Sequence, residues 1–98
     1  MMGRILFLVA YDVRDPKRLR SIHQKLKGFG AALQFSVFQC ELTPTEKQLM
    51  LSEISGIIHH GEDRVLVINV GRRRGRGKRA IQVLGRQHLP PEAGPLVI

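Results

Sequence analysis

One short segment constrains the fold more than any other part of the chain. Residues 4–11 read Arg-Ile-Leu-Phe-Leu-Val-Ala-Tyr and lead into Asp12. The brevity of this run and its content of Ile, Phe, Val and Tyr predict a β-strand rather than a helix. Side chains of a strand point alternately to two faces, and here both sets are apolar. The sets are Ile5, Phe7, Val9 and Tyr11 on one side and Leu6, Leu8 and Ala10 on the other. We therefore expect both faces of this strand to be covered.

The next segment predicts a helix that begins at Asp15 and Pro16. Aspartate is a good N-cap, and proline suits the first helical position because its missing N–H would be unpaired there anyway. Leucine and isoleucine then recur at helical spacing, and we expect Gly28 and Gly30 to end the helix by adopting positive φ. Residues 33–40 alternate in polarity and predict a second strand.

A capping box, Thr43-Pro44-Thr45-Glu46, predicts the start of a second helix. Its apolar stripe continues to Ile58, and we expect Gly61 to stop it. Residues 64–70 predict a third strand, rich in Val and Ile, and residues 81–84 a brief fourth.

The predicted order is β-α-β-α-β-β within one domain, residues 1–98. Pairing the second strand back across the first gives an α+β fold, a ferredoxin-like β-α-β-β-α-β layer with an extra C-terminal strand. Such a sheet has helices on one face, so the doubly apolar first strand predicts a homodimer packed through the open face. The apolar end of residues 89–98 either adds a strand to the partner subunit or folds back on its own sheet.

Charge indicates the class of partner. Sixteen Lys and Arg stand against eight Asp and Glu, which gives a net charge of +8. This favours nucleic acid, ahead of an anionic membrane or an acidic protein. Residues 71–79 form a glycine-rich loop whose cations suit phosphate backbones or simply aid solubility. Residues 65–70 carry no aromatic ring, which argues for backbone contact rather than base reading. The loop cations singled out for nucleic-acid contact are Arg72, Arg73, Arg74 and Arg76.

Several classes of protein are disfavoured. No apolar run approaches the roughly 18 residues of a membrane span, and the N-terminus lacks signal-peptide features, so we expect no membrane association and a cytoplasmic location. The lone Cys40 excludes an internal disulfide framework, and with four scattered His it excludes a self-contained zinc site.

Asp12 is the one carboxylate at the end of a buried strand. It either caps a turn or binds a metal, since hard cations such as Mg²⁺ prefer carboxylate oxygens. One carboxylate is a poor metal site, but a two-fold axis nearby would supply a second copy.

The chain resembles the small CRISPR-associated endoribonucleases that partner the CRISPR integrase. Three segments carry the resemblance, and weaker likeness continues through Asp63, Val65 and residues 83–85. The segments are Tyr11-Asp12-Val13, the helix start at 15–20, and Gln34-Phe35-Ser36-Val37-Phe38 with Cys40-Glu41-Leu42.

The resemblance implies a homodimer whose two copies of Asp12 share a divalent metal, Mg²⁺, with Tyr11 beside it as a second catalytic residue. It also implies that Ser36 and Phe38 line the interface. Family members often have Glu at position 39, where this chain has Gln. Helix cations are expected to contact nucleic acid, Arg18 and Arg20 by the resemblance and the others by their position. The full set is Arg14, Lys17, Arg18 and Arg20.

The sequence favours a CRISPR adaptation subunit that acts with the integrase on nucleic acid. Abundant Arg supports a scaffold that binds duplex DNA, whereas Asp12 supports a metal-dependent endonuclease acting on DNA or single-stranded RNA. A free-standing small RNA-binding or toxin-like ribonuclease is the alternative, since one fold hosts several functions.

Overall fold

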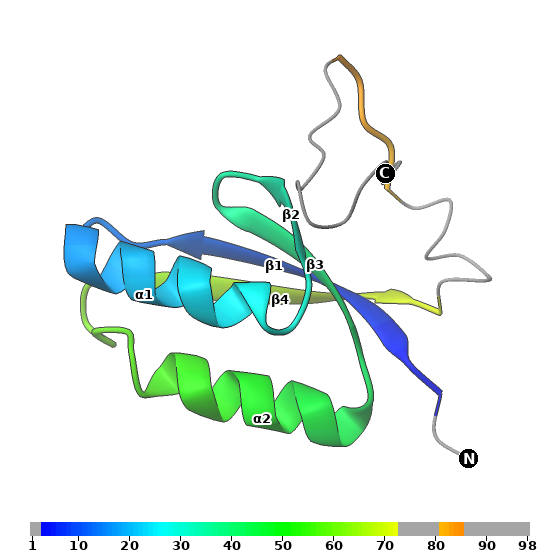
Figure 1. Ribbon diagram of the computed structural model, residues 1–98, viewed down its shortest axis with the longest axis horizontal. Coiled ribbons are helices and arrows are strands. Elements are labelled where there is room, and N and C mark those ends of the chain that lie inside the picture. Colours follow the sequence, from blue (N-terminus) through cyan, green and yellow to red (C-terminus); the bar gives the residue numbers. More distant parts are fainter. Residues whose placement is uncertain (1–2, 73–80, 86–98) are drawn as a thin grey trace.

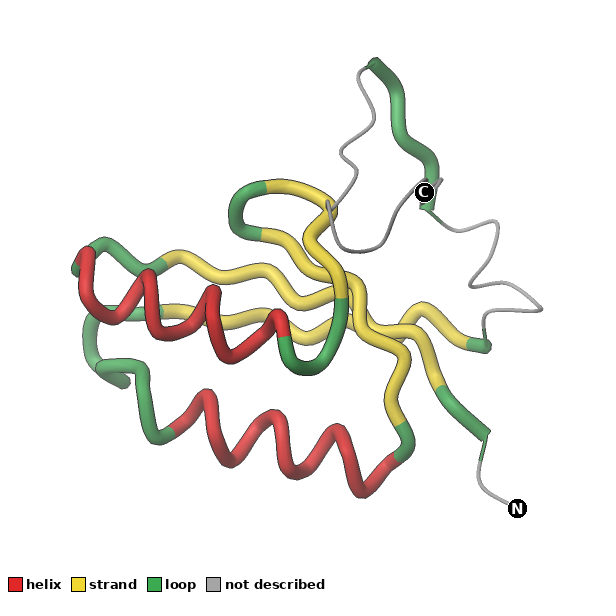
Figure 2. The backbone as a smooth tube through the Cα atoms, viewed as in Figure 1, coloured by secondary structure: helices red, strands yellow, loops and turns green. Residues whose placement is uncertain are grey.

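A computed structural model describes residues 3–72 and 81–85. The elements are β1 (Ile5–Asp12), α1 (Pro16–Lys27), β2 (Ala31–Gln34), β3 (Val37–Leu42), α2 (Pro44–Ser55) and β4 (Arg64–Gly71). The strands form an antiparallel sheet in the order β2-β3-β1-β4. Both helices lie on the same side of this sheet (Figure 1), as the colouring by element also shows (Figure 2). The predicted ferredoxin-like α+β fold is confirmed.

Both helix starts are confirmed in detail. The Asp15 side chain accepts a hydrogen bond from the backbone N–H of Arg18, and Pro16 opens α1. Thr43 and Glu46 form the reciprocal bonds of a capping box at the start of α2. These signals are predictable because each one needs only residues within a single helical turn.

The helix ends differ from expectation. Gly28 follows α1 with φ of −78°, so it needs no positive φ. Gly30 matters through close packing instead, because a Cβ there would lie 2.1 Å from the carbonyl oxygen of Gln39. The second helix ends at Ser55, before the predicted stop at Gly61, and Ile57 and Ile58 pack against the core from the loop.

The single strand predicted for residues 33–40 is wrong, because the chain turns at Phe35 and Ser36 to form the β2–β3 hairpin. Tyr11 of β1 stabilises this turn, because its hydroxyl and its backbone N–H donate hydrogen bonds to the carbonyl oxygens of Phe35 and Ser36. The turn shifts the faces of the following residues, so that Phe38 points into the core.

The brief strand predicted for residues 81–84 is also wrong, since these residues adopt no regular secondary structure. The predictions for the C-terminal extension at 89–98 and for most of the basic loop lie outside the described residues. Those loop cations are Arg73, Arg74 and Arg76.

The core lies between the sheet and the two helices. Its fully buried side chains come from both layers: Phe38, Ile22, Leu26, Met50, Val9 and Cys40. The opposite face of the sheet is also apolar, because Leu8 of β1 lies beside Ile68 of β4, and Ala10 beside Leu66. Leu66 and Ile68 are 46% and 48% exposed in the single chain. The doubly apolar β1 is thus covered by helices on one face and leaves apolar surface on the other.

Candidate functional site

Asp12 lies at the end of β1, exposed, on the same face as Leu8 and Ala10. Its partner across the β1–β4 ladder is Arg64, which is also exposed. Directly opposed residues of an antiparallel pair have Cβ atoms about 5 Å apart, so the Arg64 and Asp12 side chains leave the sheet from neighbouring positions on the same face. Sequence reasoning missed Arg64, since only the strand pairing brings it to Asp12.

Tyr11 points to the other face of β1, toward the helices, and is buried. Its hydroxyl donates to the carbonyl oxygen of Phe35 at 2.9 Å and lies 3.1 Å from Nδ1 of His23. Its backbone N–H donates to the carbonyl of Ser36 at 3.1 Å. Burial raises the pKa of the Tyr11 hydroxyl. The structure therefore separates the Tyr11 side chain from the Asp12 carboxylate and uses it to hold the β2–β3 turn.

The two predicted interface residues lie in different surroundings. Phe38 is fully buried beneath the helices, with its ring 5.2 Å from that of His23 in an edge-on arrangement. It cannot line an interface on the open face, so this expectation is corrected. Ser36 is half-buried in the turn, and its carbonyl accepts the Tyr11 N–H.

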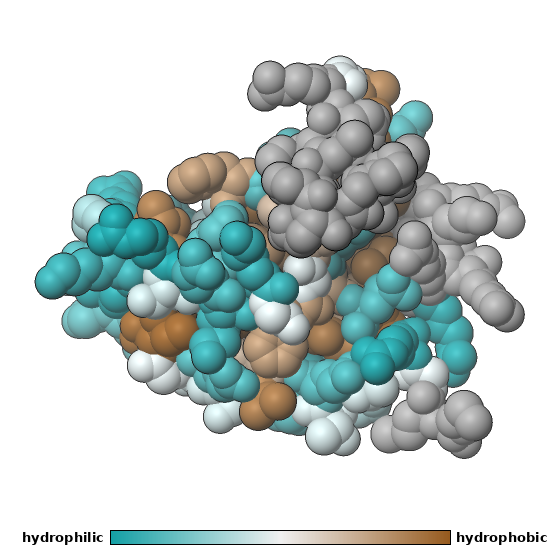
Figure 3. Space-filling model, viewed as in Figure 1, coloured by the Kyte–Doolittle hydropathy of each residue, from teal (hydrophilic) through white to brown (hydrophobic). Residues whose placement is uncertain are grey.

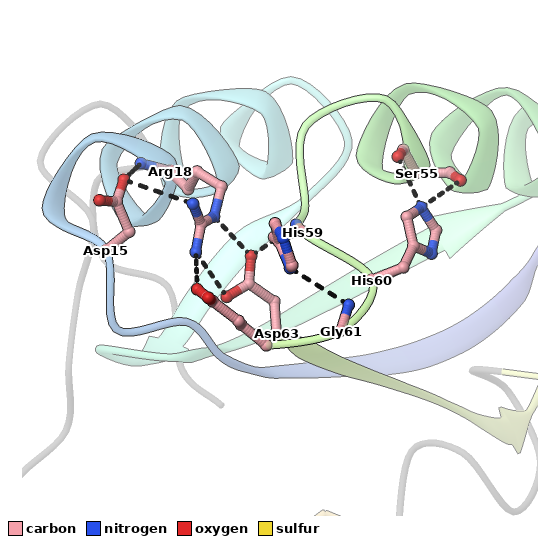
Figure 4. A network of polar contacts seen from close by, with 8 residues as sticks. Asp15, Arg18, Ser55, His59, His60, Gly61 and Asp63 are labelled. Carbon is pink, nitrogen blue, oxygen red and sulfur yellow. Dashed lines mark hydrogen bonds and ion pairs between the residues drawn. The ribbon is translucent and has the colours of Figure 1, made fainter.

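Arg18 is held in an ion-pair network that fixes the loop before β4 to the first turn of α1 (Figure 4). Its Nε donates to Oδ2 of Asp63 at 2.7 Å, and Nη2 donates to Asp63 Oδ1 at 3.2 Å and to Oε1 of Glu62 at 3.1 Å. The Asp63 side chain is 1% exposed and also accepts the backbone N–H of His59. The hydrogen bond from Arg18 lowers the pKa of Asp63, and the same bond raises the pKa of Arg18. A guanidinium so occupied is less available to a phosphate than predicted.

The other cations expected to contact nucleic acid from the helix are exposed, which leaves them open to a ligand. Arg14 lies in the loop before α1, whereas Lys17 and Arg20 lie on the helix and line a shallow groove between α1 and α2. Arg72, which follows β4, is exposed as well. None of the helices within residues 3–72 is long and apolar enough to cross a membrane.

The family resemblance implies a divalent cation at Asp12. Asp12 offers exposed carboxylate oxygens, which are the ligands that Mg²⁺ prefers. Within the described ranges, no three side chains of His, Cys, Asp or Glu gather into a metal-binding group. Asp12 therefore has suitable chemistry for such a cation, but the described part of a single chain places no metal-binding group of such side chains around it.

The fold and the site define a small ferredoxin-like protein with a strand-end carboxylate among exposed cations. The profile of the family described as "CRISPR associated protein Cas2" matches residues 5–76. The chain belongs to this family, as its motifs predicted.

Relatives and a solved structure agree with this assignment. The chain is 41% identical over 66 residues to the CRISPR-associated endoribonuclease Cas2 of Geobacter sulfurreducens, covering 67% of this chain and 70% of that protein. It is 40% identical over 65 residues to the CRISPR-associated endoribonuclease Cas2 1 of Rhodospirillum rubrum, covering 66% and 64%. The crystal structure of Streptococcus pyogenes Cas2 superposes with a TM-score of 0.73 at 30% identity, covering 83% of this chain and all of that one.

Proposed function

We propose that this protein is a homodimeric, nucleic-acid-binding subunit of CRISPR adaptation that works with the CRISPR integrase. We further propose that two copies of Asp12 hold Mg²⁺ in a phosphodiesterase site across the dimer axis. Family membership, a net charge of +8 and the exposed helix cations support nucleic-acid binding. The names of the relatives support nuclease activity.

One observation carries the proposal for a shared site: Asp12 and the exposed apolar residues of β4 lie on the same open face of the sheet. Packing that face against a second copy would remove Leu66 and Ile68 from water, which is favourable in proportion to the apolar area buried. A two-fold interface presents the same residues twice. Such an interface can bring two Asp12 carboxylates together, and two carboxylates in proximity favour a bound cation because otherwise one of them must hold a proton.

The residues of this chain would then divide the work. Asp12 binds the cation, and Arg64 offers its guanidinium to the phosphate from the neighbouring strand. When bound, Mg²⁺ stabilises the charge that develops on a phosphate under attack. Exposed cations on α1 hold the rest of the nucleic-acid backbone.

The catalytic proposal is tested with Asp12→Asn, which keeps the shape of the side chain and removes its charge. We expect Mg²⁺-dependent cleavage of RNA or DNA to fall about 100-fold or more, comparable to the loss of other groups that stabilise a transition state. Glu62→Gln is the matched control, since it neutralises an exposed carboxylate on the loop before β4. Equal cleavage by Asp12→Asn would mean that the activity comes from elsewhere.

The dimer is tested by light scattering after size exclusion, which should give about twice the chain mass at micromolar concentration. Ile68→Asp puts a charge into the open face and should yield a folded monomer. Leu49→Asp changes an exposed leucine of α2, 53% exposed, and should leave the dimer intact. A folded wild-type monomer at micromolar concentration would overturn the shared metal site as well.

Association with the integrase separates the proposal from a free-standing ribonuclease. The integrase subunit of the same locus, purified separately, should bind the dimer and bind duplex DNA more tightly in its presence. If adding the integrase changes neither the mass of the dimer in solution nor its affinity for duplex DNA, the proposed role in adaptation is refuted, whatever the result for cleavage.

A further inference from the structure

Phe35, at the tip of the β2–β3 turn, is the one mostly exposed aromatic ring among residues 3–72 and 81–85, with 75% of its surface exposed. In the space-filling view, pale brown apolar surface projects over this turn (Figure 3). The lack of rings in residues 65–70 argues for backbone contact alone. The β2–β3 turn, by contrast, supplies an exposed ring.

The ring is held in place rather than loosely attached. The hydroxyl of Tyr11 donates to the carbonyl of Phe35, and the N–H of Tyr11 donates to the carbonyl of Ser36. The imidazole of His23 lies nearly parallel to the Phe35 ring, with centroids 6.2 Å apart and an interplanar angle of 27°. His23 supports one side of the ring, and the large exposed fraction leaves the rest open to a ligand.

Two cations of α1 lie one helical turn to either side of His23, the residue that contacts the Phe35 ring. Residues three and four apart lie on the same side of a helix, so Arg20 and Lys27 are the neighbours of His23 along that flank. Both are exposed. Phe35 thus packs against a helix that carries an exposed cation one turn before His23 and another one turn after it. Unpaired nucleotides are bound by rings that stack on bases together with cations that follow the phosphates.

We infer that Phe35 is a stacking site for one unpaired base of single-stranded RNA, with Arg20 and Lys27 contacting the adjoining phosphates. The inference rests on the proposed nucleic-acid function and names its substrate as unpaired. A base inside a duplex offers no free face to a ring, whereas every unpaired base does, so the site is tolerant of sequence. The turn also lies next to the end of β1, because it is hydrogen-bonded to Tyr11, the residue before Asp12.

The test measures the affinity of the full-length protein for a fluorescein-labelled RNA of about 12 nucleotides, by anisotropy at fixed salt. Phe35→Ala should weaken binding about 5- to 150-fold, the range for losing one stacked base. Phe35→Trp should retain wild-type affinity, and Leu49→Ala, which removes an exposed leucine from α2, should change nothing. A strand of the same length without bases should bind wild type and Phe35→Ala equally.

Salt dependence separates the ring from the cations. Phe35→Ala should keep the slope of log affinity against log salt, because it removes no phosphate contact. Arg20→Ala and Lys27→Ala should each reduce the slope by about 0.7, the value for one phosphate on a single strand. A 2-aminopurine base in the RNA should lose fluorescence on stacking with wild-type protein and keep it with Phe35→Ala.

Three results would overturn the inference. The first is equal affinity of Phe35→Ala and wild type for the RNA. The second is a shift of Phe35→Ala from dimer to monomer, which would mean that the ring packs between subunits. The third is binding of duplex DNA with no binding of the single strand, which refutes the stacking site while the scaffold function stands. Absence of binding to either nucleic acid would refute the proposed function itself.

Discussion

Replacing Tyr11 by Phe separates a structural role of the hydroxyl from a catalytic one. The hydroxyl carries one proton, which it donates to the carbonyl of Phe35 at 2.9 Å. The contact with His23 Nδ1 at 3.1 Å then requires the imidazole to donate, which assigns the proton to Nδ1. Tyr11→Phe removes both hydrogen bonds and keeps the ring, which packs 6.3 Å from that of Phe38.

The expected cost follows from these two bonds. A hydrogen bond contributes about 0.5–1.5 kcal/mol net, and a polar group left buried without a partner costs more. The Phe35 carbonyl lies at an exposed turn, where water can replace the hydroxyl, while His23 is half-buried. We expect the free energy of unfolding to fall by about 1–2 kcal/mol, and each kcal/mol should lower Tm by about 4–8 °C for a domain of this size.

Urea denaturation at one fixed protein concentration measures this cost, since the apparent stability of a dimer depends on concentration. Cleavage is then measured at saturating RNA and at a temperature where both proteins are folded, and its rate should stay within about 2-fold of wild type. Asp12→Asn should show the opposite pattern, with cleavage lost and stability kept. If Tyr11→Phe loses cleavage at an unchanged denaturation midpoint, the hydroxyl acts on the substrate and the structural role is refuted.

Three further outcomes are expected. In the folded protein the pKa of Asp63 lies below its ordinary value of 3.8. The ionised carboxylate therefore contributes to the free energy of unfolding above pH 3.8, and this contribution is lost as the pH falls through the lower folded pKa. Asp63→Asn should make the free energy of unfolding, measured by urea melts at several pH values, fall less steeply in acid. Burial raises the pKa of Cys40 from 9.0 to about 11, so at about pH 8 iodoacetamide should label the native thiol at least about 100-fold more slowly than the unfolded chain, as followed by mass spectrometry. For about six phosphate contacts, log affinity for duplex DNA should fall against log salt with a slope near −5, and Lys17→Ala should reduce the size of that slope by about one. Arg18→Ala should instead act mainly on the free energy of unfolding, because the Arg18 guanidinium is bonded to Asp63.

The sequence predicts helix starts better than strand ends because of the range of the interactions involved. Asp15 and the Thr43–Glu46 pair act within one helical turn, so their roles are visible in the sequence. The turn at Phe35 and Ser36 contains no Gly, Pro, Asn or Asp, and Ser36, a weaker turn former, is the one local signal for it. It depends on hydrogen bonds from Tyr11, which lies on another strand.

The same distinction explains the site. The position of Asp12 at the end of a largely buried strand follows from the pattern of residues 4–11, whereas its exposure in the single chain does not, because that pattern predicts both faces to be covered. The pairing of Arg18 with Asp63 joins residues 45 positions apart, and Arg64 reaches Asp12 only through the β1–β4 register. The resemblance implies an interface role for Phe38, but the turn at 35–36 places Gln34 opposite Val37, so Phe38 points to the helix-covered face instead.

The alternation of β1 gives the adjacent residues Tyr11 and Asp12 different tasks. Asp12 projects with the open apolar face, where a second copy would complete a metal site, while Tyr11 projects under the helices and fixes the turn that carries Phe35. A base stacked on Phe35 would therefore be positioned, through the backbone of β1, relative to the carboxylate one residue further on. In that case Tyr11 would position the RNA through the turn that carries Phe35, and Asp12 would act in cleavage. The Tyr11 hydroxyl itself would contact neither the metal nor the phosphate. Tyr11→Phe should then loosen Phe35 and weaken RNA binding, leaving the rate of cleavage at saturating RNA unchanged.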